Sequence, residues 1–90
     1  MDISIVLPKL NSRNLALESL RMLQHYMSST GLSYEIILVD DGSRPEERIS
    51  AAEAGSAVRV IQLDTNMGKG YAVRQGMLKA EGDCCIFTDI

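Results

Sequence analysis

The sequence predicts an α/β fold, a Rossmann-like parallel sheet in the order βαβαβαβ with helices on both faces. Short, fully apolar runs alternate along the chain with amphipathic stretches. Parallel strands that are buried on both faces have this apolar character, and helices that cover a sheet are amphipathic. The 90 residues contain no repeat, linker or low-complexity tract, so we expect one small domain over residues 1–90.

The first part of the chain predicts a strand, a helix and a second strand. The apolar run Ile3–Leu7 is stopped by Pro8, which indicates a short buried strand. Ser12 or Asn14 can cap the helix that follows, and Tyr34–Val39 is the second buried strand. The apolar side of that helix is expected to comprise Ala16, Leu17, Leu20, Leu23, Tyr26 and Met27.

The remainder predicts two more helices and two more strands. Ser43 and Glu46 have the spacing of a capping box for a short helix that ends by Gly55. Val58–Leu63 is the third strand, and Cys84–Thr88 is a fourth strand that we expect to be buried. The helix between them opens at the glycine-rich turn and carries its small and apolar side chains at Ala72, Val73, Gly76, Met77 and Ala80.

Composition and charge exclude several classes of function. A net charge of −3 gives no basic surface for nucleic acid. No apolar stretch reaches the roughly 20 residues of a membrane helix, and Met1-Asp2 is not the start of a signal peptide. Cys84 and Cys85 are adjacent and have no metal-binding spacing, so we interpret them as reduced thiols of a cytoplasmic protein.

Polar residues follow the carboxyl ends of the predicted strands. Right-handed crossovers bring these ends to one edge of the sheet, where open α/β sheets bind ligands. Asp40 and Asp41 follow the second strand directly, and one of them can point back into the turn while the other faces the crevice. A carboxylate there can accept hydrogen bonds from a nucleobase or a ribose hydroxyl. The alternative is that both acids only form the turn with Gly42.

The glycine-rich turn is a candidate anion site. Gly68 and Gly70 flank Lys69 at the start of a helix, where backbone N–H groups and the helix dipole attract phosphate. The alternative is a loop that needs glycine for its backbone conformation. Asp89 ends the fourth strand, and a single carboxylate is a poor metal site unless substrate phosphates complete it. The sequence has no GxxxxGK[ST] motif and lacks the third glycine of GxGxxG.

Several segments together resemble the N-terminal part of family 2 glycosyltransferases with the GT-A fold. The subgroup that they resemble most is the polyprenyl-phosphate and dolichol-phosphate mannosyl- and glucosyltransferases. The segments that carry the resemblance are Ser4–Pro8 with Asn11, Ile37–Ser43, Asn66–Gly76 and Gly82–Ile90.

The resemblance implies a nucleotide-binding site and leaves the catalytic base outside these residues. Pro8, Leu10 and Asp41 would flank the nucleobase, and Asp89 would contact the ribose or a diphosphate-bound Mg²⁺ or Mn²⁺, as its metal ligand. The full set of implied nucleotide-binding residues is Pro8, Leu10, Asn11, Asp40, Asp41, Gly68, Lys69, Gly70 and Asp89. No residue of the chain is assigned a catalytic role.

The resemblance also implies the reaction and its partners. The family transfers a sugar from a nucleotide-diphospho-sugar with inversion, here to a polyprenyl phosphate or a glycan, and a full-length parent is expected at the cytoplasmic face of a membrane. These 90 residues alone are expected to be inactive. The exposed edge of the sheet is expected to favour a homo-oligomer.

Two other functions stay open. A nucleotidyltransferase-like enzyme would have a glycine-rich loop directly after the first strand, where this chain has Pro8–Asn11. A non-catalytic interaction module would keep the fold and lose the chemistry. Leu10 stands where the family has an aromatic residue, and Ser12 where it has an acid, which favours that module.

Overall fold

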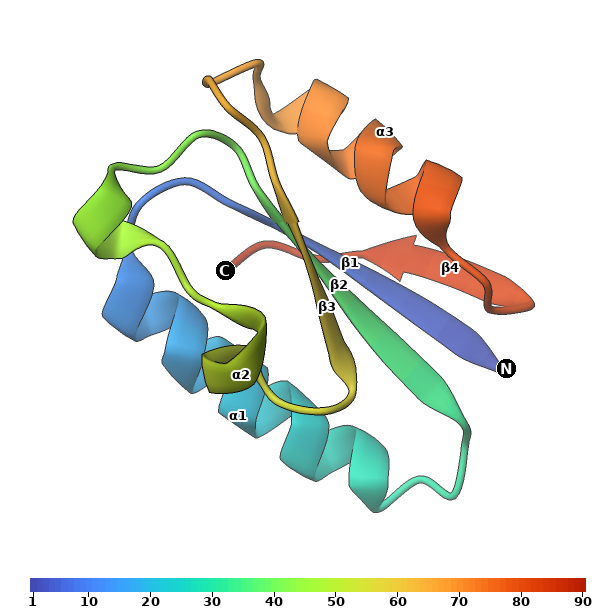
Figure 1. Ribbon diagram of the computed structural model, residues 1–90. Helices are drawn as coiled ribbons and strands as arrows, with labels where there is room; N and C mark the ends of the chain where they lie inside the picture. The colour runs from blue at the N-terminus through green and yellow to red at the C-terminus, as the bar shows by residue number, and fades with distance from the viewer.

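A computed structural model describes all 90 residues and confirms the predicted α/β architecture (Figure 1). Four parallel strands form one sheet in the order β3-β2-β1-β4. The elements in chain order are β1 (Ile3–Lys9), α1 (Arg13–Ser28), β2 (Tyr34–Asp40), the 3₁₀ turn η1 (Pro45–Glu47), α2 (Ala51–Ala54), β3 (Val58–Gln62), α3 (Lys69–Lys79) and β4 (Cys84–Phe87).

Helices cover both faces of the sheet. Figure 1 shows α1 and α2 on one side of the strands and α3 on the other. Alternate residues of β1 and β2 therefore pack into separate cores, as the period of two along a strand requires. The core on the α1 side contains Ile5, Leu7, Ala16, Leu20, Met27, Ile36 and Leu38 among its members. The core on the α3 side contains Val6, Ile37, Val39 and Ala72.

The ends of the strands opposite the predicted ligand edge are held together by a buried carboxylate. Glu35 accepts hydrogen bonds from the Ser4 hydroxyl at 2.6 Å and from the backbone N–H of Glu81 at 2.7 Å. It also pairs with Arg59 at 3.2 Å, and the N–H of Gly82 donates to Ser4 Oγ at 2.8 Å. Three strands and the turn after α3 are thus joined far from the candidate site.

The start of α1 differs from the prediction. Neither Ser12 nor Asn14 caps the helix, because Ser12 lies in the left-handed region with φ of 51° and makes no side-chain cap hydrogen bond. The preceding Asn11 also has a positive φ, so the chain leaves β1 through a tight turn. Ala16, Leu20 and Met27 are buried as predicted, whereas Tyr26 is 65 % exposed because no element covers its side of the helix.

The predicted capping box at Ser43 and Glu46 is wrong. Pro45 begins only a single 3₁₀ turn, and Ser43 is buried among polar groups of the candidate site. The capping box lies seven residues further on. Ser50 Oγ accepts from the N–H of Glu53 at 3.2 Å, and the N–H of Ser50 donates to the Glu53 carboxylate at 3.0 Å.

The buried side of α3 is narrower than predicted. Ala72 and Gly76 are its only fully buried residues, and Met77 is exposed. A Cβ atom on Gly76 would lie 2.4 Å from a methyl carbon of Val6, so the missing side chain lets the helix approach β1 closely.

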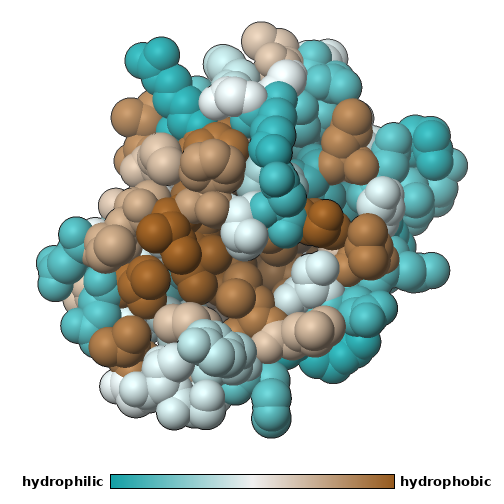
Figure 2. Space-filling model, turned by 180° about the vertical axis from the view of Figure 1, so that it is seen from behind, coloured by the Kyte–Doolittle hydropathy of each residue, from teal (hydrophilic) through white to brown (hydrophobic).

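β4 is not buried as its apolar run predicts, but it does form the exposed edge of the sheet that we expected. β4 pairs only with β1, so it is an edge strand, and Ile86 and Phe87 are about half exposed while Cys84 is exposed. Apolar side chains gather over much of the face shown in Figure 2. A groove between α1 and β4 is lined by Ile3, Ile5, Leu23, Tyr26, Met27, Thr30, Leu32, Ile86 and Thr88.

No helix has the length and apolar character that crossing a membrane requires.

Candidate functional site

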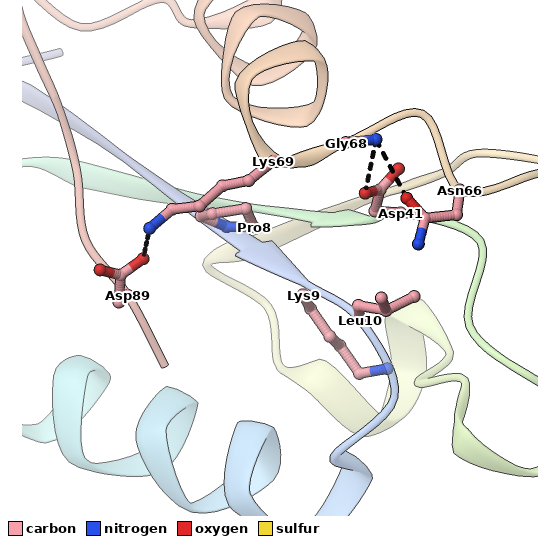
Figure 3. Close-up of a pocket in the computed structure, with 8 residues that line it drawn as sticks. All are labelled: Pro8, Lys9, Leu10, Asp41, Asn66, Gly68, Lys69 and Asp89. Carbon is pink, nitrogen blue, oxygen red and sulfur yellow. Dashed lines mark hydrogen bonds and ion pairs between the residues drawn. The ribbon is translucent and has the colours of Figure 1, made fainter.

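A cavity of about 280 Å³ lies at the carboxyl ends of the central strands, beside the start of α3 (Figure 3). It is lined by Pro8, Lys9, Leu10, Asp41, Asn66, Gly68, Lys69 and Asp89. Most of the site residues predicted from the sequence therefore come together here. Three of them, Asn11, Asp40 and Gly70, do not line the cavity.

Asp41 connects β2 to the glycine-rich turn. Its carboxylate accepts the backbone N–H of Met67 at 2.7 Å and that of Gly68 at 3.1 Å, as Figure 3 shows for Gly68. Asn66 Oδ1 accepts from the same Gly68 N–H at 3.0 Å. Each carboxylate oxygen can accept about two hydrogen bonds. Asp41 therefore holds the turn in place and still has capacity to accept hydrogen bonds from a ligand.

Asp40 points away from the cavity and into a buried polar cluster. It is 1 % exposed, and its carboxylate accepts the Ser43 N–H at 2.7 Å and the Lys9 ammonium at 3.1 Å. Burial acts to raise the pKa of Asp40, but the hydrogen bonds from Ser43 and Lys9 outweigh it and lower the pKa overall. The two adjacent acids therefore separate as predicted, one into the turn and one toward the crevice.

Asn11 and Gly70 have structural positions near the cavity. The N–H of Asn11 donates to Ser43 Oγ at 2.6 Å, and its side-chain oxygen accepts from the N–H of Arg44 at 3.0 Å. Asn11 thus ties the turn after β1 to the turn after β2. Gly70 lies in the first turn of α3, where an added Cβ atom would contact nothing.

An ion pair between Lys69 and Asp89 crosses the mouth of the cavity (Figure 3). Lys69 is the first residue of α3, so its charge adds to the positive end of the helix dipole. Both side chains are largely exposed, and the pair can open toward solvent at little cost. The mouth therefore suits a diphosphate, with a cation and a helix start on one side.

The residues of this chain do not complete a metal site. No three His, Cys, Asp or Glu side chains lie close enough together to hold a metal ion. Asp89 and Asp41 are the two carboxylates that line the cavity, and Asp41 already accepts two backbone N–H groups. Mg²⁺ is commonly held by one or two carboxylates together with substrate phosphates. A cation could bind here only if a diphosphate and further oxygen ligands accompanied it.

Sequence reasoning missed Lys9, whose backbone lines the cavity while its side chain is buried behind it. The prediction ended the first strand at Leu7, before Pro8, but β1 continues to Lys9 and places it beside Asp40. A lysine two residues beyond one apolar run, with two acids directly after the next apolar run, is the signal that could have identified the pair.

Comparisons with known proteins agree with this geometry. Residues 4–89 match the family model "Glycosyl transferase family 2". The chain is 34 % identical to dolichyl-phosphate beta-glucosyltransferase of Drosophila melanogaster, covering 99 % of this chain and 30 % of the relative. It is 37 % identical to undecaprenyl-phosphate 4-deoxy-4-formamido-L-arabinose transferase of Pseudomonas fluorescens, covering 97 % of this chain and 27 % of that relative.

Solved structures give the same result. The crystal structure of S. aureus TarS matches with a TM-score of 0.74 at 26 % identity, over 99 % of this chain and 16 % of that one. The fold is thus the GT-A fold of such transferases. The chain spans less than a third of the length of the curated relatives that it matches. With its family model matched from residue 4 to residue 89, this chain belongs to glycosyl transferase family 2.

Proposed function

We propose that this chain is the donor-binding part of an inverting glycosyltransferase that uses a nucleotide-diphospho-sugar. The observation that carries the proposal is the cavity with Asp41 at one side and Lys69 with the start of α3 at its mouth. A carboxylate suits the N–H groups of a base, and a cationic helix start suits phosphate. The cavity thus offers each half of a nucleotide diphosphate a partner of matching chemistry.

The donor would lie across the cavity from strand ends to helix start. Pro8 and Leu10 would contact the base, Asp41 would accept its N–H, and Lys69 would neutralise the diphosphate. The cavity volume of about 280 Å³ is at the lower end of small-ligand pockets. The sugar would therefore extend beyond the cavity toward the exposed β4 edge.

We also propose a divalent cation, Mg²⁺ or Mn²⁺, that binds with the donor. Asp89 would contribute one carboxylate and the diphosphate the other principal ligands. Such a cation supplies positive charge at the leaving diphosphate. Lys69 now pairs with Asp89, so donor binding would exchange that ion pair for contacts to phosphate and metal.

The names of the relatives suggest the acceptor. Dolichyl phosphate and undecaprenyl phosphate are both lipid phosphates. We propose that the whole protein glycosylates a polyprenyl phosphate, with a glycan as the other candidate, at the cytoplasmic face of a membrane. We propose further that these 90 residues self-associate through the uncovered β4 edge.

Calorimetric titration of the chain with UDP and GDP, each with and without Mn²⁺, tests the donor site. We expect one of the two nucleotides to bind, and to bind more tightly with Mn²⁺. Asp41→Ala should weaken this affinity by about tenfold or more, because a hydrogen bond to a charged group contributes about 1.5–3 kcal/mol. Asp64→Ala is the matched control, since Asp64 is exposed in the loop between β3 and α3 and does not line the cavity.

Two outcomes would contradict the proposal. Equal affinity of the wild type and Asp41→Ala would exclude the assigned base contact. No binding of either nucleotide would favour the non-catalytic module, in which Asp41 serves only the glycine-rich turn. We expect no sugar transfer by these residues with acceptor and metal supplied, because none of them is placed to act as the catalytic base.

A further inference from the structure

We propose that Lys9 is a positioning residue that determines which of two adjacent carboxylates, Asp40 or Asp41, faces the cavity. Neither the family resemblance nor the relatives assign it a role. Its effect on nucleotide affinity rests on the proposed function, but its effect on the arrangement of the two acids does not.

The Lys9 ammonium is fully enclosed and fully used. Its side chain is 0 % exposed, and Nζ lies 3.1 Å from Asp40 Oδ2, 3.1 Å from Ser43 Oγ and 2.6 Å from the Glu47 carbonyl oxygen. An ammonium group has three donors, and each has an acceptor here. Figure 3 shows the side chain running away from Asp41 and Gly68, so it acts from behind the cavity.

The backbone of Lys9 holds the second acid. Its carbonyl oxygen accepts the N–H of Asp41 at 2.7 Å, and Lys9 and Asp40 are register partners of β1 and β2. Lys9 therefore fixes Asp40 through its side chain and Asp41 through its main chain. Consecutive residues of an extended strand point to opposite sides, so burial of Asp40 directs Asp41 toward the cavity.

The buried position of Asp40 depends on the positive charge of the Lys9 ammonium. A buried carboxylate without a counter-charge is strongly unfavourable, and breaking a buried pair by removing one partner is costly. Without the Lys9 charge, Asp40 gains free energy by turning toward water, and we infer that it turns toward the cavity, which lies at the same end of β2. That rotation would displace Asp41 and release the N–H groups of Met67 and Gly68 that it holds.

Amide hydrogen exchange of Lys9→Met and of Lys9→Met/Asp40→Asn tests the inference without any ligand. In Lys9→Met we expect the Met67 and Gly68 amides to exchange at least about tenfold faster relative to the Gly82 amide. In the double variant, which has no buried charge, we expect their protection to return to within about threefold of the wild type. Both variants lack the Lys9 hydrogen bond to the Glu47 carbonyl of η1. Restored protection in the double variant would therefore show that the unpaired charge of Asp40, and not the loss of that hydrogen bond, exposes the two amides.

Ser4→Ala is the matched control at the other end of the sheet. It removes buried hydrogen bonds to Glu35 and Gly82, so it should expose the Gly82 amide and leave those of Met67 and Gly68 protected. If Lys9→Met does not fold, a folded double variant with protected Met67 and Gly68 amides supports the inference. A double variant that stays unfolded, or that folds with these amides unprotected, overturns it, as does wild-type protection in Lys9→Met.

Nucleotide titration of the same variants is the second readout. We expect Lys9→Met to weaken the affinity for the nucleotide that the wild type binds by about tenfold. The double variant Lys9→Met/Asp40→Asn should recover the wild-type affinity. If the wild type binds neither UDP nor GDP, the proposed function fails while amide exchange still decides the role of Lys9. An unchanged affinity in folded Lys9→Met would overturn the positioning role.

Discussion

Asp40 and Asp41 are chemically identical neighbours whose surroundings give them different tasks. Asp40 accepts the buried Lys9 ammonium and the Ser43 N–H, whereas Asp41 accepts two backbone N–H groups at the cavity wall. Hydrogen-bond donors rather than local sequence therefore determine which acid is available to a ligand. Lys9 supplies the decisive donor because it is the only one of these groups that also carries charge.

Gly42 is the residue that allows the turn after β2 to pack against the turn before α3. Its φ is +82°, and an added Cβ would lie 2.4 Å from the carbonyl carbon of Thr65 and 2.5 Å from the backbone N of Asn66. We expect Gly42→Ala to reduce the free energy of unfolding by about 3 kcal/mol or more, from left-handed strain and the backbone clash together. Urea unfolding followed by circular dichroism measures this.

Gly31→Ala separates the two contributions. Gly31 has a similar φ of +76°, but an added Cβ there would contact nothing. Gly31→Ala should therefore reduce the free energy of unfolding only by the cost of the left-handed backbone conformation, about 1 kcal/mol. Equal losses in the two variants would show that the turn after β2 yields to the clash and that the contact with residues 65 and 66 does not fix it.

The sequence predicts a site residue correctly where a charged side chain stands at the end of an apolar strand or at the start of a helix. Asp41, Lys69 and Asp89 combine a charged side chain with the end of an apolar run or the start of a helix, and they meet at one cavity. Lys9 was not predicted because a lysine beside a proline normally indicates an exposed turn. Its burial depends on Asp40 and Ser43, more than thirty residues away in sequence, which no local pattern contains.

At the scale of elements, the packing of α3 depends on the absence of a side chain. Alanine is about 1 kcal/mol more favourable than glycine inside a helix. At Gly76, however, a Cβ would lie 2.4 Å from a Val6 methyl and 3.1 Å from a Val39 methyl. We expect Gly76→Ala to lower the unfolding free energy by about 1–3 kcal/mol, because overpacking exceeds the gain in propensity. Thermal unfolding measures it.

Gly70→Ala is the control on the same helix. An added Cβ at Gly70 contacts nothing, so the propensity gain should appear alone and raise stability by up to about 1 kcal/mol. The two substitutions are therefore expected to have opposite signs. Stabilisation by both would mean that α3 can move away from β1 without loss.

Strand and helix order followed from the sequence, but the choice between two equivalent motifs did not. Ser43–Glu46 and Ser50–Glu53 both have the spacing of a capping box. Only the second forms one, because Ser43 already bonds with Lys9, Asn11 and Asp40. Tertiary contacts thus decide between local signals of equal strength. The apolar run of β4 did not predict its burial correctly for the same reason. Burial depends on a neighbouring element, and β4 lies at the edge of the sheet.

At the scale of the whole molecule, three carboxylates predict the response to acid. The pKa of Glu53 is lowered to about 2 by Arg13 and by the capping hydrogen bonds of Ser50. Hydrogen bonds from Ser4 and Glu81 lower that of Glu35 against the effect of burial, and Asp40 is lowered as well. The unfolded chain therefore binds more protons than the folded one as the pH falls below the ordinary carboxylate range.

Stability should thus be constant near neutral pH and decline as the pH falls from the ordinary glutamate pKa of 4.5 toward 2. Urea midpoints across this range measure the decline. Glu53→Gln should be less stable at neutral pH and show a shallower decline, whereas Glu18→Gln, on an exposed position of α1 without an ion pair, should follow the wild type. A flat profile for the wild type would contradict the ion pairs and caps described here.

We propose that the β4 edge is where copies of the chain interact. β4 pairs with β1 on one side only, so its outer side is unpaired, and an apolar groove lies beside it. Both unpaired edges and large apolar patches favour association. We expect a second copy to bind this edge, so that the average mass measured by light scattering increases with concentration. Ile86→Lys should shift the chain toward monomer, because Ile86 lines the groove and a lysine on an edge strand opposes pairing.

Leu78→Lys gives the matched comparison. Leu78 is a more exposed apolar residue than Ile86, but it lies on α3 and lines none of the cavities. If general hydrophobicity drives association, Leu78→Lys should reduce the mass at least as much as Ile86→Lys. If the β4 edge drives it, only Ile86→Lys should do so. A wild-type chain that stays monomeric at the highest attainable concentration would exclude both, because the uncovered edge would then lack the contact area that a stable pair requires.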